Sequence, residues 1–94
     1  MLRFEWDESK NKRNRRKHGI WFEEAQTVFD DANARLFDDP EHSSREDRFL
    51  LLGFSSVGRI LVVVHCYRKS ESVIRIISAR KATRKEAEFY EEGI

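Results

Sequence analysis

The start of the chain changes from an alternating pattern to a wholly polar one. Apolar and polar side chains alternate over residues 3–6, with the two-residue period of a short strand. No apolar side chain follows in residues 8–18, yet Asp7 suits a helix N-cap and Gly19 suits the position after a helix end. We therefore predict a polar helix here, which either lies on the surface or packs through the stems of its side chains.

The next segment has the hydrophobic spacing of a helix with one core face. Apolar residues stand at positions 21, 22, 25, 28 and 29, and Asp30, Asp31 and Asn33 follow as helix-ending residues. Residues 34–37 then predict an edge strand. A polar loop is expected over residues 38–44, where Pro40 breaks the regular structure.

Three apolar runs follow, at roughly residues 47–54, 59–67 and 73–79. The segments between them are short and polar, which is typical of hairpin connections, so the runs predict an antiparallel meander. Residues 61–64 are apolar on both faces, which indicates a central strand covered, at least in part, on both sides.

A helix is predicted at the end of the chain. Strong helix formers replace β-branched residues near Arg80, and Thr83 with Glu86 has the spacing of a capping box, which places the helix start at Thr83. The predicted order is β-α-α-β-β-β-β-α. It indicates an α+β fold class with a mainly antiparallel sheet, and helices packed on one face are the simplest architecture.

Several cations gather at the predicted start of this last helix, namely Arg80, Lys81, Arg84 and Lys85. Cations are unfavourable there, because a helix N-terminus carries a partial positive charge. Backbone N–H groups and cationic side chains together make an anion site, most naturally for phosphate. A solvated basic patch without a ligand is the alternative.

Composition and charge narrow the class of protein. The chain has 94 residues, 39% hydrophobic and 37% charged, with a net charge of +1. This length predicts a single domain over residues 1–94 with a small core. One cysteine, Cys66, excludes an intramolecular disulfide, and the charged start of the chain does not fit a signal peptide. The apolar runs are too short to span a membrane, so we expect a cytoplasmic protein with no membrane partner.

The near-neutral net charge conceals a segregation of charge along the chain. Residues 10–18 contain lysines and arginines and no acid, whereas acids dominate residues 23–47 and cations dominate residues 68–85. This arrangement suits a protein that binds a polyanion with one surface and another partner with a second surface.

Motifs at both ends of the chain resemble one protein family. They are Phe4-Glu5-Trp6-Asp7, Lys10, Asn14, Lys17-His18-Gly19-Ile20, Phe22-Glu23-Glu24-Ala25, Val28-Phe29, Arg75-Ile76-Ile77-Ser78-Ala79-Arg80-Lys81-Ala82-Thr83 and Glu86. Together they resemble the BrnT toxins of bacterial type II toxin–antitoxin systems. The resemblance implies a RelE-like fold and a ribonuclease activity that arrests translation. It also implies neutralisation by a BrnA-like antitoxin, expected in a 2:2 complex that binds operator DNA through the antitoxin.

RNA cleavage without a metal needs a base for the 2′-hydroxyl, a cation on the pentavalent phosphate and an acid for the leaving oxygen. Arg80 is the leading candidate for the cation, because its planar guanidinium can hold two phosphate oxygens. Arg68 and Arg75 are further candidates, although Arg75 is equally explained as a solvent-facing strand residue. Lys81, Arg84 and Lys85 are expected to bind RNA phosphates.

The first predicted helix offers a second set of site residues. Lys10, Asn14 and Lys17 or His18 share one helix face by their spacing, and that face could lie along RNA. His18 is the leading acid or base, with Lys17 beside it, since an imidazole exchanges protons near neutral pH. The alternative is that His18 only interacts with the dipole of the helix end.

The remaining chemically active residues are expected to be mainly structural. His65 is expected to be a core or hairpin residue, with a proton-transfer role in the site as the alternative, Tyr90 is expected to pack, and His42 lies in a polar loop. No metal-ligand spacing is present, so we expect no metal and no cofactor. The alternative function is a non-catalytic module that binds nucleic acid and an antitoxin in autoregulation of its operon.

Overall fold

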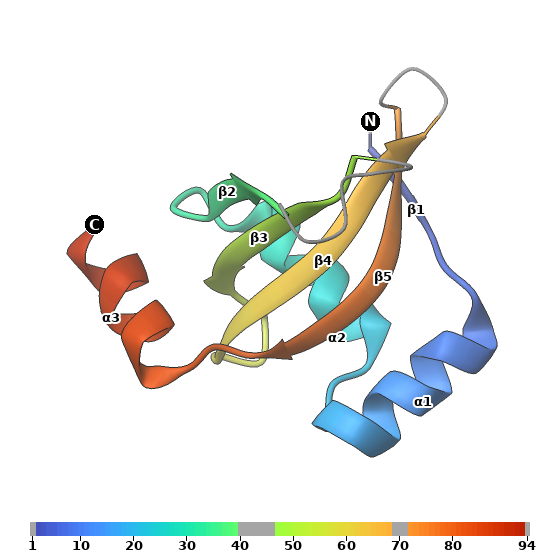
Figure 1. Cartoon of the computed structure of the whole chain (residues 1–94), viewed down its shortest axis with the longest axis horizontal. Coiled ribbons are helices and arrows are strands. Elements are labelled where there is room, and N and C mark those ends of the chain that lie inside the picture. The colour runs from blue at the N-terminus through green and yellow to red at the C-terminus, as the bar shows by residue number, and fades with distance from the viewer. Residues whose placement is uncertain (1, 40–46, 69–71, 94) are drawn as a thin grey trace.

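The computed structural model describes residues 2–39, 47–68 and 72–93, and it confirms the predicted order and α+β class (Figure 1). The elements are β1 (Arg3–Glu5), α1 (Glu8–His18), α2 (Phe22–Ala25), the 3₁₀ helix η1 (Gln26–Asp30), β2 (Arg35–Asp38), β3 (Phe49–Phe54), β4 (Ile60–Arg68), β5 (Val73–Lys81) and α3 (Arg84–Glu92). Pro40 and His42 lie outside the described residues. No helix within the described ranges is long and apolar enough to cross a membrane.

The five strands form one sheet in the order β1-β5-β4-β3-β2. The meander from β2 to β5 is antiparallel, as predicted, and β4 is the central strand. β2 lies at the edge, also as predicted. β1 pairs in parallel with β5 at the other edge, so the first strand of the chain lies beside the last.

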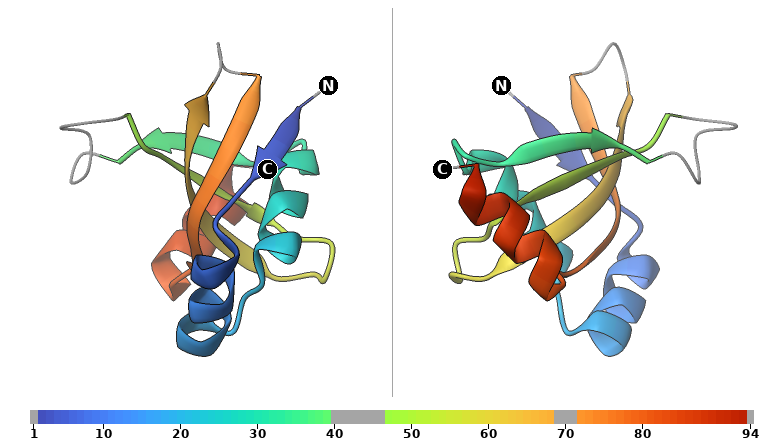
Figure 2. Two further views of the ribbon diagram at one scale, coloured as in Figure 1. Left: turned by 90° about the vertical axis from the view of Figure 1, so that its right-hand side faces the viewer. Right: turned by 60° about the vertical axis from the view of Figure 1, so that its left-hand side comes forward.

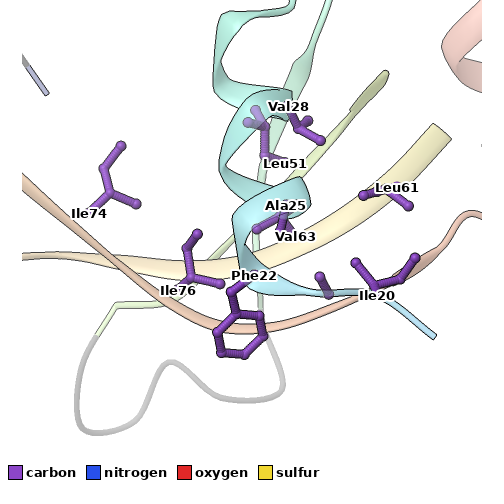
Figure 3. Close-up of a cluster of buried hydrophobic side chains, with 10 residues drawn as sticks. Ile20, Phe22, Ala25, Val28, Leu51, Leu61, Val63, Ile74 and Ile76 are labelled. Atoms are coloured by element: carbon purple, nitrogen blue, oxygen red, sulfur yellow. The ribbon is translucent and has the colours of Figure 1, made fainter. Parts of the chain in front are cut away.

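Each face of the sheet has its own apolar cluster. The α2 face, which carries Leu51, Leu61, Val63, Ile76 and Ala79, packs against Ile20, Phe22, Ala25 and Val28 from the α2–η1 segment and the turn before it (Figure 3). The α3 face carries Leu50, Leu52, Val62, Ser78 and Arg80, because strand partners point to the same side of a sheet. Here Leu52 and Val62 pack with Tyr90 of α3.

The expectation that all helices pack on one face is wrong. α3 lies across the sheet from α2, as the turned views in Figure 2 show. The physical reason is that β3 and β4 are apolar on both sides, so a second element must bury Leu52 and Val62.

Two buried asparagines hold the polar helix α1 to the rest of the molecule. Asn11 accepts a hydrogen bond from the Phe22 amide at 2.7 Å and donates to Glu23. Asn14 donates to the carbonyls of Ile20 and Ala79, at 2.8 and 2.9 Å, and accepts from the Ala79 amide. A helix without apolar residues is therefore attached by hydrogen bonds, which the sequence analysis did not anticipate.

The predicted second helix is shorter than expected and continues as 3₁₀ turns. The Thr27 hydroxyl donates to the Glu24 carbonyl at 2.6 Å, and such local side-chain bonds compete with α-helical ones. The other predicted ends are confirmed. Asp7 caps α1, Gly19 adopts a left-handed φ of 76° after it, and Thr83 with Glu86 forms the capping box of α3.

Candidate functional site

The α3 face brings the three candidate arginines to one side of the sheet. Arg80 is paired with Val62 and Arg75 with Cys66, and Val62, Cys66 and Arg68 alternate along the same side of β4. A register shift between β4 and β5, near Ile77, keeps Arg75 and Arg80 on this side. The sheet therefore collects arginines that are far apart in the sequence.

A hollow of about 260 Å³ opens beside this face, between α1, β5 and the residue before β3. It is lined by Lys10, Arg13, Asn14, Lys17, His18, Arg48, Ile77 and Ser78, and we call it the cationic hollow. Lys10, Lys17 and His18 meet here, as the helical spacing predicted. Ser78 is a wall residue and precedes Arg80 by two positions on the same strand face.

Sequence reasoning missed two cations of the hollow. Arg13 lies three residues after Lys10 and four before Lys17, so the helical spacing could have revealed it. Arg48 enters from the segment before β3, and only the pairing of β3 with β4 brings it there. No sequence pattern marked it.

Asn14 serves the fold rather than a ligand. Its side chain is buried, and both its oxygen and its nitrogen are bonded to backbone groups of Ile20 and Ala79. An amide with its donors and acceptor occupied has little left to offer RNA. Asn14 therefore holds α1 to β5, and both N–H groups of its side chain are already used.

Arg80 forms a two-point ion pair with Glu86. Nη1 donates to Oε1 at 2.8 Å and Nη2 donates to Oε2 at 3.0 Å, and Oε1 also accepts from the Thr83 amide. These hydrogen bonds from Arg80 lower the pKa of Glu86 to about 2 and raise the pKa of Arg80. The Nε edge of Arg80 donates to no residue that the structure describes, so it can still reach a phosphate oxygen.

Arg68 and Arg75 share a carboxylate at the far end of the face. The distance from Arg75 Nη1 to Glu5 Oε2 is 3.0 Å, and the distance from Arg68 Nε to the same oxygen is 3.6 Å. Arg75 is thus a partly buried ion-pair residue rather than a purely solvent-facing one. Both arginines lie on the α3 face, and the Glu5 carboxylate compensates part of their charge.

The four cations near the start of α3 do not gather as the sequence suggested. β5 continues to Lys81, so strand alternation places Arg80 and Lys81 on opposite faces. Arg84 is exposed and lies 3.7 Å from Glu88, while Lys85 borders an apolar groove. The predicted gathering of four cations at the N-terminus of α3 is therefore wrong, and of these four residues only Arg80 lies on the sheet face beside the hollow. Phosphate binding by these residues stays a prediction.

His65 and Tyr90 are packing residues. The His65 ring is fully buried on the α2 face, 3.1 Å from the Val63 carbonyl and 3.3 Å from the Tyr67 hydroxyl, and burial lowers its pKa. The Tyr90 hydroxyl donates to Asp31 at 2.6 Å, and burial raises the pKa of Tyr90 to about 12. Neither group reaches the cationic hollow. Among the described residues, no three His, Cys, Asp or Glu side chains are grouped to bind a metal.

A small α+β protein with cations on and beside one sheet face has the features of a nucleic-acid-binding protein. The family model described as "Ribonuclease toxin, BrnT, of type II toxin-antitoxin system" matches residues 6–86, so the chain belongs to the BrnT family of ribonuclease toxins. Its members are RNA-cleaving toxins with a cognate antitoxin. No curated protein matches the chain.

The fold of the chain is similar to that of a solved BrnT structure. The crystal structure of the Brucella abortus ribonuclease toxin BrnT is similar to this chain with a TM-score of 0.67 and 23% sequence identity. The similarity covers 89% of this chain and 100% of the Brucella chain. The five-stranded sheet with its helices is therefore a BrnT-like fold.

Proposed function

We propose that this protein cleaves RNA on the α3 face without a metal ion, and thereby inhibits translation. One observation supports this most directly. Lys10, Arg13, Lys17, His18 and Arg48 surround one hollow, and Arg80 stands on the adjoining sheet face. Clustered cations with a proton-transfer group beside them match what a phosphodiester and its transition state need.

In the proposed reaction, RNA supplies its own nucleophile. A base takes the proton of the 2′-hydroxyl, the 2′ oxygen bonds to phosphorus, and the bond to the 5′ oxygen breaks as an acid protonates that leaving oxygen. His18 is the proposed proton-transfer group, with Lys17 beside it. Arg80 stabilises the charge on the phosphate through its Nε edge, held in place by Glu86.

The other cations are proposed to position the RNA. Lys10, Arg13 and Arg48 bind phosphates within the hollow, and Arg68 and Arg75 extend the basic track along the face. Lys81, Arg84 and Lys85, being outside the hollow, contribute to the surrounding field rather than to chemistry.

Several finer properties are part of the proposal. We propose that residues 1–94 form one RelE-like toxin domain, supported by the pairing of β1 with β5 near opposite ends of the chain. We also propose a 2:2 complex with a BrnA-like antitoxin that binds operator DNA through the antitoxin, and action in the cytoplasm. The match to a toxin family of a type II toxin–antitoxin system supports the antitoxin partner.

RNA cleavage in EDTA tests the proposal. The purified toxin should cut a defined RNA under single-turnover conditions with EDTA present, and its expression without antitoxin should arrest growth. Binding without cleavage would support the alternative, a non-catalytic module for nucleic acid and antitoxin.

RNA affinity should fall steeply with salt. Contacts between lysine or arginine and phosphate release counterions, so log K should fall with log salt by about 0.7 per phosphate contacted on a single strand. Titration of a cleavage-resistant RNA at several salt concentrations measures this slope. A flat response would show that the hollow does not bind the RNA backbone.

A further inference from the structure

The Asn14 side chain joins α1 to β5 beside the proposed cleavage site (Figure 1). Within the described residues, β1 pairs with β5 only as far as Arg75, so it does not reach Ala79. The Asn14 nitrogen donates to the Ala79 carbonyl at 2.9 Å, and the Asn14 oxygen accepts from the Ala79 amide at 3.1 Å. Residues of paired antiparallel strands exchange two hydrogen bonds in the same way. The amide of Asn14 thus binds β5 as a neighbouring strand would.

The groups that Asn14 binds are close in sequence to both candidate catalytic residues. Ala79 directly precedes Arg80 on β5. Asn14 also donates to the carbonyl of Ile20 at 2.8 Å, and Ile20 follows His18 by two residues. His18 itself lies about one helical turn after Asn14 on α1, and both line the cationic hollow. One amide is therefore bonded to the backbone beside Arg80 and to the backbone just after His18.

The burial of these hydrogen bonds makes α1 depend on them. Asn14 is 6% exposed and Ala79 is 1% exposed. Hydrogen bonds are stronger where water is excluded, and a buried carbonyl or amide left without a partner is costly. No apolar side chain of residues 8–18 offers another way to anchor the helix. The position of α1 against β5 is therefore set mainly by the Asn14 amide.

We propose that Asn14 is a positioning residue, which fixes His18 of α1 relative to Arg80 of β5 without touching RNA itself. This inference rests on the cleavage function proposed above. Proton transfer needs heavy atoms within about 2.6–3.2 Å of each other, whereas flexible lysine stems can adjust to reach a phosphate. A displaced α1 should therefore slow cleavage much more than it weakens RNA binding.

Asn14→Gln is the main test, because it keeps the donors and the acceptor but moves them one methylene away from the backbone. Single-turnover cleavage at saturating RNA should fall by about 30-fold or more, since a misplacement of about 1 Å can cost on the order of 10²-fold. The affinity for a cleavage-resistant RNA should stay within about threefold of wild type. Circular dichroism verifies that the variant is folded.

Asn11→Gln is the matched control on the same helix. Asn11 is also fully buried, but its side chain accepts from the Phe22 amide at 2.7 Å and donates to Glu23 at 2.9 Å, so it attaches α1 to α2 rather than to β5. It does not line the cationic hollow. Cleavage per folded molecule should therefore stay within about threefold of wild type.

A double-mutant cycle shows whether Asn14 acts through His18. His18→Ala should lower the cleavage rate by itself. Adding Asn14→Gln to that variant should lower the rate by at most about threefold more, because there is no imidazole left to misplace. A purely structural role of Asn14 would instead add its full loss to that of His18→Ala.

Several outcomes would overturn the inference. They are a wild-type cleavage rate in folded Asn14→Gln, an equal loss in Asn11→Gln, full activity of His18→Ala, and a full additional loss in the double variant. If Asn14→Gln does not fold, the smaller Asn14→Ser replaces it in every measurement, and unfolding of both would assign Asn14 to folding alone. A wild-type protein that cleaves no RNA would overturn the proposed function itself, which is a different result from a wild type that cleaves and variants that match it.

Discussion

Two arginine–glutamate pairs of similar geometry lie in different regions of the molecule. Arg59 donates to Glu24 from Nε at 2.8 Å and from Nη2 at 2.6 Å, while Arg80 donates to Glu86 from Nη1 at 2.8 Å and from Nη2 at 3.0 Å. The hydrogen bonds from each arginine lower the pKa of its carboxylate partner. What differs is the surroundings of the two pairs.

The Arg59–Glu24 pair is enclosed by other structural contacts. The Glu24 side chain is 9% exposed and also accepts from the Ser55 hydroxyl, and Arg59 reaches the Gly19 carbonyl at 3.3 Å. These bonds tie α2 to the turn between β3 and β4. The Arg80–Glu86 pair instead lies between the cationic hollow and the apolar groove bordered by Lys85, with one guanidinium edge available. The same chemical unit thus serves the fold in one place, and in the other it has the exposed donor edge that the proposed function needs.

The largest expected effect separates the two pairs by activity. Arg80→Ala should lower the single-turnover rate of RNA cleavage by about 10²–10³, the loss seen when one donor to a developing oxyanion is removed. Arg80→Lys should be nearly as damaging, because an ammonium cannot form the two-point fork. The free energy of unfolding should change by at most about 1 kcal/mol, since the pair is 39% and 33% exposed. If both folded variants cleave RNA at the wild-type rate, Arg80 is not part of the catalytic site.

Arg59→Ala should produce the opposite result. It removes two charged hydrogen bonds from a mostly buried carboxylate, so the free energy of unfolding should fall by about 1.5–3 kcal/mol. Cleavage per folded molecule should not change, because Arg59 lies outside the cationic hollow. Denaturant unfolding and single-turnover cleavage on the same preparation measure both quantities. A large loss of cleavage without loss of stability would abolish the distinction between the two pairs.

The sequence predicted the fold well because the signals were local. The caps at Asp7 and Thr83, the left-handed Gly19 and the apolar run of residues 61–64 each determine an element through near neighbours. The side of the sheet taken by α3 was not predictable in this way. It depends on which apolar residues of β3 and β4 the other helices leave uncovered.

The candidate site was predicted less completely, because its residues meet through tertiary contacts. Helical spacing correctly grouped Lys10, Lys17 and His18 in one hollow. The same spacing could not show that the Asn14 side chain is hydrogen-bonded to the backbone of Ala79 in β5. Nor could it show that Arg48 joins the hollow through the pairing of β3 with β4.

The capping box beside Arg80 offers a smaller, purely structural test. Thr83→Ala removes the acceptor for the Glu86 amide, 3.2 Å away, so the free energy of unfolding should fall by about 0.5–2 kcal/mol. Thr83→Ser keeps the acceptor and serves as the control. Denaturation midpoints compare the three proteins, and an unchanged midpoint in Thr83→Ala would mean that the cap does not hold α3.

Glu86→Gln isolates the charge of the Arg80 pair and has the smallest expected effect. The amide oxygen can still accept from the Thr83 amide, so the cap survives while the ion pair is lost. The loss at neutral pH should be about 1 kcal/mol or less, because both side chains are about one-third exposed. Cleavage should fall less than in Arg80→Ala, since the guanidinium remains but is no longer held.

The pH dependence of the difference in free energy of unfolding between wild type and Glu86→Gln shows whether that difference comes from the charge of Glu86. The pKa of Glu86 is lowered from 4.5 to about 2 in the folded protein, so its charge stabilises the fold above pH 4.5 and this contribution disappears as the pH falls toward 2. Gln cannot titrate, and Glu24 titrates in both proteins and cancels. The gap in free energy of unfolding between wild type and Glu86→Gln should therefore be constant from pH 7 to about 5 and close by about pH 2. Urea unfolding across this range measures the gap, and one that persisted at the acid end would have to come from packing, because the carboxylate would already be protonated.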